Sequence, residues 1–121
     1  MINEPTLKGG ELAAQELLAQ GEVFTSVFAY NDAMAIGAIS VFEDNGYKVP
    51  SDISIIGFDD VLLSKYSRPK LTTLRYPILE MAIHAAQRAI AYSSNEEPVK
   101  SKLKYLPSLV KRQSTTHHFR Y

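Results

Sequence analysis

Residues 53–60 read Ile-Ser-Ile-Ile-Gly-Phe-Asp-Asp, an apolar, β-branched run that ends in glycine, an aromatic residue and two adjacent carboxylates. Three isoleucines among the first four residues predict a strand that is covered on both faces, as in a parallel sheet. Ligands of open α/β sheets bind just outside the carboxyl ends of such strands, where Asp59 and Asp60 lie. The stretch therefore predicts an α/β fold with a binding site at one sheet edge.

The composition is typical of one small globular domain. The chain has 121 residues, of which 45% are hydrophobic, and 13 basic side chains balance 13 acidic ones. This balance argues against a nucleic-acid surface, and the lack of cysteine excludes disulfides and thiolate metal sites. No apolar run approaches the ~20 residues that a membrane span needs, and no signal peptide is visible. We therefore expect a cytoplasmic location and no membrane contact.

The chain before this stretch predicts a helix, a strand and a second helix. Apolar residues recur at helical spacing over 7–18, and β-branched and aromatic residues predict a buried strand at 23–30. The helix predicted at 33–42 is apolar nearly all round and ends at Asn45-Gly46. Since a sheet covers only one side of such a helix, we expect another surface to cover the rest.

The chain after this stretch predicts shorter elements. We expect a helical turn at 61–66, a third strand at 71–76 and a helix at 78–91 with Pro77 in its first turn. Beyond these lie a polar loop at 93–98, short strands at 102–106 and 109–110, and a frayed tail at 114–121. This order is half or less of a doubly wound α/β layer.

Polar residues follow the first two predicted strands. Asn31 and Asp59 are separated by about one strand–helix–strand unit, so both should reach the same edge of a parallel sheet. Asp59 could accept hydrogen bonds from the vicinal hydroxyls of a sugar, although Asp59 and Asp60 could also cap the following turn. Of Asn31 and Asp32 only one can cap the next helix; we expect Asp32 to be the cap and Asn31 a ligand residue.

Arg75 and Tyr76 end the third predicted strand. The guanidinium donors of Arg75 and the aromatic face of Tyr76 could contact a sugar. Alternatively, the two side chains could serve only as packing and a surface charge at the edge of the strand. His84 is expected on a solvated helix face, and Lys111-Arg112 at a solvated strand end. No histidine or carboxylate set has the spacing of a metal site, and no nucleophile–base motif occurs. We therefore expect no catalytic residue, no metal and no cofactor.

Residues 25–115 closely resemble the effector-binding core of the lactose/galactose repressor (LacI/GalR) family of bacterial transcription regulators. The matching stretches are VFAYNDAMAIGAISVFEDNGYKVPSDISIIGFDD, RPKLTTLRYP and LPSLVKRQST. The wording of FDDVLLSKY and LTTLRYP is most similar to the galactose repressor branch.

The resemblance implies part of a periplasmic-binding-protein-like (type I) two-lobe fold, with a mostly parallel sheet, flanking helices and a sugar between the lobes. It implies that residues 1–121 are the C-terminal part of the sugar-sensing and dimerisation domain. Residues 1–76 and 104–115 would form the second lobe, and 77–103 would belong to the first lobe of the intact protein. A helix-turn-helix DNA reader and the rest of the first lobe would precede Met1, which then looks like an internal or engineered start.

The resemblance also implies roles for single residues. It carries sugar contact onto Asn31 and Asp59. The family often has glutamine where Tyr76 stands, so Tyr76 departs from the commoner pattern; Arg75 and Tyr76 are candidates from their own chemistry. It implies a homodimer. The expected dimer contacts are Ile36, Ile39, Leu63 and Tyr66. Operator DNA would be bound only through the helix-turn-helix, which this chain lacks.

These features favour the sugar-effector-binding and dimerisation part of a repressor of galactose-type sugar metabolism, which is not an enzyme. A secreted, transport-type sugar-binding protein has the same fold, and a magnesium-dependent phosphotransfer domain could use Asp59 and Asp60. If residues 78–91 belong to another lobe, the apolar stripe of that helix lacks its native partner here. We then expect it to pair with the same helix of another copy.

Overall fold

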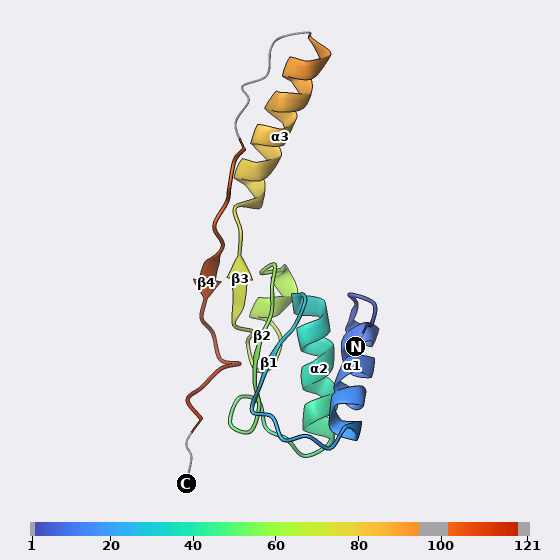
Figure 1. Ribbon diagram of the computed structural model, residues 1–121. Helices are drawn as coiled ribbons and strands as arrows, with labels where there is room; N and C mark the ends of the chain where they lie inside the picture. The colour runs from blue at the N-terminus through green and yellow to red at the C-terminus, as the bar shows by residue number, and fades with distance from the viewer. Residues whose placement is uncertain (1, 95–101, 119–121) are drawn as a thin grey trace. The chain divides into compact units, whose positions relative to one another are not determined.

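The computed structural model describes residues 2–94 and 102–118 (Figure 1). Two compact units divide the chain: the first comprises Met1–Arg75 and Leu109–Tyr121, and the second Tyr76–Ser108. The elements in chain order are α1 (Leu7–Ala19), β1 (Ser26–Phe28), α2 (Asp32–Asp44), β2 (Ser54–Ile56), the 3₁₀-helix η1 (Leu62–Lys65), β3 (Thr73–Arg75), α3 (Ile78–Ser93) and β4 (Ser108–Val110).

Parallel pairing joins β1 to β2 and joins β2 to the residue before β3. β1 pairs with β2 so that Val27 lies opposite Ile55, and Ile56 forms a parallel bridge to Thr72, just before β3. β3 forms a second two-stranded sheet with β4. The predicted α/β class with parallel strands is confirmed. The strands are shorter than predicted, because only residues 26–28 of the expected strand at 23–30 have a paired neighbour.

The hydrophobic core of the first unit lies between the strands and the two helices. Phe42 and Ile55 are fully buried in it, and Phe24 packs on Phe42 with ring centroids 5.8 Å apart. The side chains of Ile53 and Leu71 complete its centre. Alternation along residues 53–56 places Ile53 and Ile55 in the core, whereas Ser54 and Ile56 on the other face are only partly buried, so the predicted cover of both faces is incomplete.

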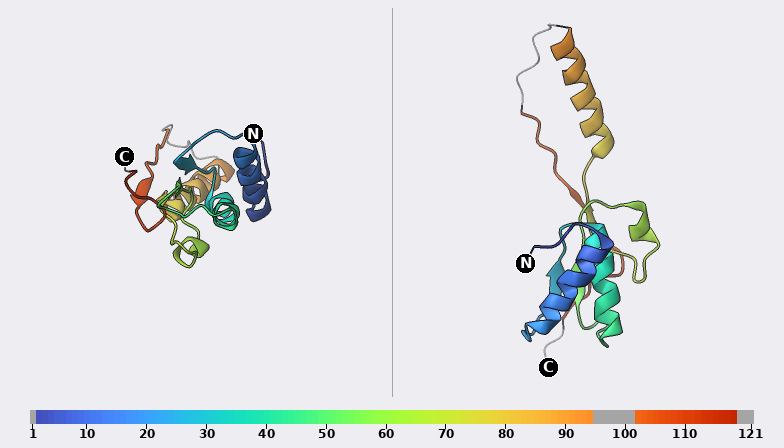
Figure 2. Two further views of the ribbon diagram at one scale, coloured as in Figure 1. Left: turned by 90° about the horizontal axis from the view of Figure 1, so that it is seen from below. Right: turned by 90° about the vertical axis from the view of Figure 1, so that its right-hand side faces the viewer.

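Helix α1 covers the side of α2 that the sheet leaves open, and Figure 2 shows the two helices side by side in both views. Glycines make this approach possible. A Cβ atom at Gly37 would lie 2.1 Å from the carbonyl oxygen of Leu7, and one at Gly10 would lie 2.1 Å from that of Met34. The extra surface that the apolar α2 required is thus largely supplied by the same chain.

The expectation of a frayed tail at 114–121 is wrong at its first residue. Ser114 is fully buried rather than part of a frayed tail: its hydroxyl donates to the carbonyl oxygen of Ile55, 2.6 Å away, and accepts from the N–H of Thr72. The backbone N–H of Ile55 donates in turn to the carbonyl oxygen of Ser114. This polar run is read locally as a loop, but it supplies hydrogen bonds to two strands. Residues 119–121 lie outside the described part.

The second unit consists mainly of α3. No residue of α3 is buried, and the large apolar side chains Ile78, Leu79, Ile83 and Ile90 are exposed. His84 is not simply solvated, because its Nδ1 lies 2.6 Å from the hydroxyl oxygen of Tyr105. The strand predicted at 102–106 is wrong, since these residues form no ladder. Most of the polar loop predicted at 93–98 lies outside the described residues.

None of the described helices is both long and apolar enough to cross a lipid bilayer.

Candidate functional site

The carboxyl ends of β1 and β2 lie at one edge of the first unit. Asn31 follows β1 and Asp59 follows β2, and the N–H of Asp32 donates to the carbonyl oxygen of Phe58 at 3.0 Å. Asp59 and Asp60 have φ angles of +123° and +59°, in the left-handed region that non-glycine residues seldom adopt. Strain of this kind costs about 1–3 kcal/mol per residue and gathers at functional sites.

Asn31 caps helix α2, which reverses the capping roles predicted for Asn31 and Asp32. The side-chain oxygen of Asn31 accepts from the N–H of Met34 at 2.9 Å, and its amide nitrogen donates to the carbonyl oxygen of Pro5 at 3.0 Å. An amide has two N–H groups and two acceptor lone pairs, so these two bonds use half of its capacity.

Asp32 instead holds the loop after β2 in place. Its side chain is fully buried, and one carboxylate oxygen accepts from the N–H of Val61 at 2.8 Å and from the hydroxyl of Ser64 at 2.6 Å. The other oxygen accepts from the hydroxyl of Thr73 at 2.5 Å. A Cβ atom at Gly57 would lie 2.3 Å from this second oxygen, so only glycine fits there. Asp32 therefore ties α2 to η1 and β3.

Asp60 is the centre of an ion cluster rather than a turn cap. One carboxylate oxygen accepts from Nε and Nη2 of Arg75 at 2.6 Å, and the other accepts from Nη2 of Arg112 at 2.6 Å. Burial tends to raise the pKa of Asp60, but the hydrogen bonds and positive charges of Arg112 and Arg75 outweigh it and lower that pKa below its ordinary 3.8. Arg112 is largely buried, so its prediction as a solvated residue is wrong.

The predicted sugar-contact residues fall in both units of the chain. Asn31, Asp59 and Arg75 belong to the first unit, whereas Tyr76 is the first residue of the second. The structure brings Arg75 to Asp60, and the N–H of Asp59 donates to the carbonyl oxygen of Leu74.

Sequence reasoning missed the roles of Asp32 and Arg112 in this arrangement. A signal for Asp32 was present in the sequence: only one of the adjacent residues Asn31 and Asp32 can cap α2, so the other is free for a different contact. Arg112 carried no local signal, since its partner Asp60 is far away in the sequence.

The residues predicted for a dimer contact differ in exposure. Leu63 and Tyr66, at η1, are 47% and 69% exposed, and Ile36 is partly buried. Ile39 is 4% exposed because it packs into the core of its own chain. Its role in a dimer contact stays a prediction, with little of its side chain left to offer a partner.

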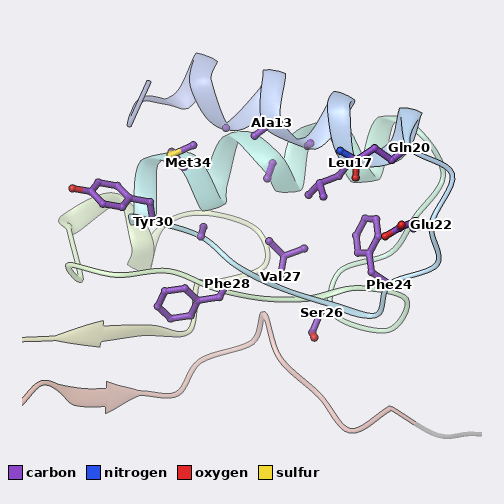
Figure 3. A pocket seen from close by; sticks show the side chains of 14 residues that line it. Ala13, Leu17, Gln20, Glu22, Phe24, Ser26, Val27, Phe28, Tyr30 and Met34 are labelled. Atoms are coloured by element: carbon purple, nitrogen blue, oxygen red, sulfur yellow. The ribbon is translucent and has the colours of Figure 1, made fainter. Parts of the chain in front are cut away.

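A groove of about 460 Å³ lies between α1, α2 and β1 (Figure 3). Its walls are largely apolar, with Leu17, Phe24, Val27 and Met34 among the lining side chains, and Glu22 and Gln20 near one end. Neither Asn31 nor Asp59 lines it. The groove is thus separate from the edge at which the polar residues gather.

The Asp59–Asp60 pair is poorly suited to magnesium, because both oxygens of Asp60 already accept hydrogen bonds from arginines. Among residues 2–94 and 102–118, no group of three or more histidines, cysteines or carboxylates is placed to hold a metal ion.

Comparison with known proteins places this geometry in a family context. Residues 2–115 match the family described as "Periplasmic binding protein-like domain". The HTH-type transcriptional regulator GalR of Escherichia coli (strain K12) is 51% identical over 115 residues, which are 95% of this chain and 34% of that protein. The chain thus spans about a third of the length of this curated relative.

Two solved structures are similar over most of the chain. The Lac repressor dimer bound to operator and the anti-inducer ONPF has a TM-score of 0.84 and 30% identity, covering 93% of this chain and 39% of that one. A complex of the transcriptional regulator CelR with cellobiose has a TM-score of 0.85 and 28% identity, covering 90% and 33%.

Proposed function

Because this chain belongs to the family of periplasmic-binding-protein-like domains found in LacI/GalR-type transcription regulators, we propose that it is the sugar-sensing and dimerisation part of a bacterial repressor of galactose-type sugar metabolism. The intact protein works inside the cell, binds operator DNA through a separate N-terminal domain and catalyses no reaction. Sugar binding shifts the repressor toward the state with lower or higher operator affinity, by binding one state more tightly than the other.

The observation that carries this proposal is the strained Asp59–Asp60 turn at the carboxyl edge of the parallel strands. A carboxylate there accepts two hydroxyl hydrogen bonds from one sugar ring, and the Asn31 amide beyond the end of β1 adds a donor and an acceptor. Arg75 and Tyr76 follow at the end of β3 and supply further donors and an aromatic face. The relative CelR is described in complex with the sugar cellobiose, which supports a sugar as the ligand class.

The proposed dimer contact consists of Ile36, Leu63 and Tyr66. Leu62, at 69% exposure, adds to the apolar surface of η1, which is more than a single soluble chain needs to expose. The Lac repressor is described as a dimer. Because α1 already covers one side of α2, η1 contributes more of this contact than the helix does.

We assign residues 77–103 to the first lobe of the intact protein and residues 1–76 and 104–115 to the second. The division of the chain into two units agrees with most of this assignment, except that Tyr76 and residues 104–108 fall in the second unit together with α3. No residue of α3 is buried, as expected for a helix whose lobe is incomplete. A cleft between two lobes needs both to hold the sugar, so this chain supplies only part of the contacts.

The experiment is a galactose titration of the isotope-labelled chain, followed by its amide NMR spectrum. A micromolar site is worth about 8 kcal/mol, and loss of half its contacts leaves about 4 kcal/mol, a dissociation constant of about 1 mM or weaker. We expect saturable shifts at Asn31 and Asp59 that Asp59→Asn removes. Asp52→Asn is the matched control, since Asp52 is exposed and precedes β2, at the other end of the strand.

Two results would count against the proposal. If neither Asn31 nor Asp59 shows a saturable shift, the proposed sugar site is wrong. Micromolar binding by this chain contradicts the assignment of the remaining contacts to a second lobe.

A further inference from the structure

The Asp60 cluster joins three segments of the first unit. Asp60 lies in the loop after β2, Arg75 is the last residue of β3, and Arg112 follows β4. The Asp60 side chain is only 4% exposed, and each of its two oxygens is 2.6 Å from a guanidinium nitrogen. Charge-assisted hydrogen bonds of this kind are about twice as strong as neutral ones.

Arg112 is the member of this cluster that is held most firmly by the rest of the chain. Its Nη1 donates to the carbonyl oxygen of Leu71 at 2.9 Å, and its backbone N–H donates to the hydroxyl oxygen of Thr72 at 2.9 Å. The next N–H, of Gln113, donates to the carbonyl oxygen of Lys70. These bonds hold Arg112 against residues 70–72, so Asp60 accepts from a group that cannot swing away.

Arg75 is the outer member of the cluster. Its side chain is 54% exposed, in contrast to 12% for Arg112. A free arginine side chain loses rotamer entropy when it is ordered on a ligand, and a guanidinium that is already held in place avoids much of that loss. Asp60 binds Nε and Nη2 together, which sets the plane of the guanidinium.

The neighbouring residue Asp59 is held to the same strand, because its N–H donates to the carbonyl oxygen of Leu74. Consecutive residues of the loop, Asp59 and Asp60, thus bind consecutive residues of β3, Leu74 and Arg75. The orientation of the Arg75 guanidinium and the position of the Asp59 backbone are therefore fixed by neighbouring bonds between the same two segments.

On the basis of the proposed function, we propose that Asp60 and Arg112 are positioning residues of the sugar site, which do not contact the sugar but hold the Arg75 guanidinium ready to donate to a sugar hydroxyl. Arg112 fixes Asp60, and Asp60 fixes Arg75. This role explains a carboxylate next to Asp59 whose two oxygens both accept from arginines.

The test measures hydrogen exchange of arginine Nε–H groups by NMR in the 121-residue chain, without sugar. The charge-assisted bond to Asp60 should slow exchange of the Arg75 Nε–H by roughly tenfold or more relative to that of Arg68, which is exposed. Asp60→Asn keeps the side-chain shape and tolerates the left-handed backbone at this position. In this variant we expect the Arg75 rate to approach that of Arg68, while Asp52→Asn leaves it unchanged.

A galactose titration of the same samples separates positioning from packing. In Asp60→Asn, the sugar-induced shift of Arg75 should be lost while that of Asp59 remains. An Arg75 Nε–H that exchanges equally slowly with and without the Asp60 carboxylate overturns the proposal, whatever the sugar does. If galactose causes no saturable shift in the unsubstituted chain, the proposed function is overturned instead. The Arg75 Nε–H exchange rates then still show whether Asp60 holds the Arg75 guanidinium.

A second variant covers the case in which Asp60→Asn does not fold. Arg112→Lys keeps a positive charge near Asp60 but removes the fork that also donates to Leu71. Faster Arg75 Nε–H exchange in this variant supports the role of Arg112, and an unchanged rate overturns it.

Discussion

Asp32 is the buried carboxylate that holds the candidate site to helix α2, and its replacement tests how that site is built. Its oxygens accept three hydrogen bonds, from the N–H of Val61 and the hydroxyls of Ser64 and Thr73. Asp32 also occupies the first turn of α2, where a negative charge is favourable. We compare two substitutions at this position, Asp32→Ala and Asp32→Asn.

The expected costs follow from the three donors. Asp32→Ala leaves them buried without an acceptor, at about 1–3 kcal/mol each, so we expect a loss of about 5 kcal/mol in the free energy of unfolding. Asp32→Asn keeps the volume. Its NH₂ group can face Thr73, whose hydroxyl can rotate to accept, and its oxygen keeps the bonds from Val61 and Ser64. The loss of charge assistance should then cost only about 1–2 kcal/mol.

The assay is urea unfolding of the 121-residue chain followed by far-UV circular dichroism, since the chain has no tryptophan. With a slope of about 1–3 kcal/mol per molar urea, Asp32→Asn should lower the midpoint by roughly 1 M, and Asp32→Ala should remove most of the transition. Asp44→Ala is the matched control at the exposed end of α2 and should change stability by less than about 0.5 kcal/mol.

Two results would refute this reasoning. If Asp32→Asn is as destabilising as Asp32→Ala, the hydroxyls of Ser64 and Thr73 do not adapt, and the charge itself is required. If Asp32→Ala costs less than about 1 kcal/mol, the loop after β2 is not held by this carboxylate.

Three further predictions concern the ion cluster and the apolar surfaces. Because the pKa of Asp60 is lowered in the folded chain, its stabilising contribution is present above about pH 4 and is lost as the pH falls through the folded pKa. When the free energy of unfolding is measured against pH, Asp60→Asn should therefore lose less stability between neutral and acidic pH than the unsubstituted chain. An equal loss in both proteins would contradict this prediction. Ile36→Glu should lower the mass seen by light scattering toward that of the monomer, whereas Gln15→Glu on exposed α1 should not; equal masses would exclude the proposed contact. Ile83→Lys should weaken self-association of the chain in sedimentation equilibrium, since it places a charge in the exposed stripe of α3, and an unchanged association constant would show that α3 does not pair with another copy.

The helices could be predicted closely because their signals are local. The apolar spacing of α1 and the Asn45-Gly46 stop of α2 lie within a few residues of the elements they define, and Gly46 adopts a positive φ angle. The short turn at η1 follows for the same reason. Strand ends were less certain, since pairing with a neighbour decides them, and sequence alone does not supply the neighbour's register.

The parts of the site that could not be predicted depend on partners far away in the chain. Asn31 and Asp32 are both good caps, and their roles are decided by donors on Ser64 and Thr73. Likewise Arg112 and Ser114 look like surface residues until residues 70–72 and β2 are placed beside them. Local propensity therefore predicted that Asn31 and Asp59 lie at the same edge of the sheet, but it reversed the capping roles of Asn31 and Asp32.

The left-handed backbone at Asp59 and Asp60 raises the question of why these positions hold aspartates rather than glycines. Glycine at both positions would adopt the left-handed backbone at no steric cost, whereas two aspartates cost about 1–3 kcal/mol each. For Asp60 the ion pairs with Arg75 and Arg112 offset that cost. The backbone N–H of Asp59 donates to the carbonyl oxygen of Leu74, a bond that glycine could also make. Both oxygens of Asp60 already accept from arginines, which is why Asp59, rather than Asp60, is the carboxylate that we propose for the ligand.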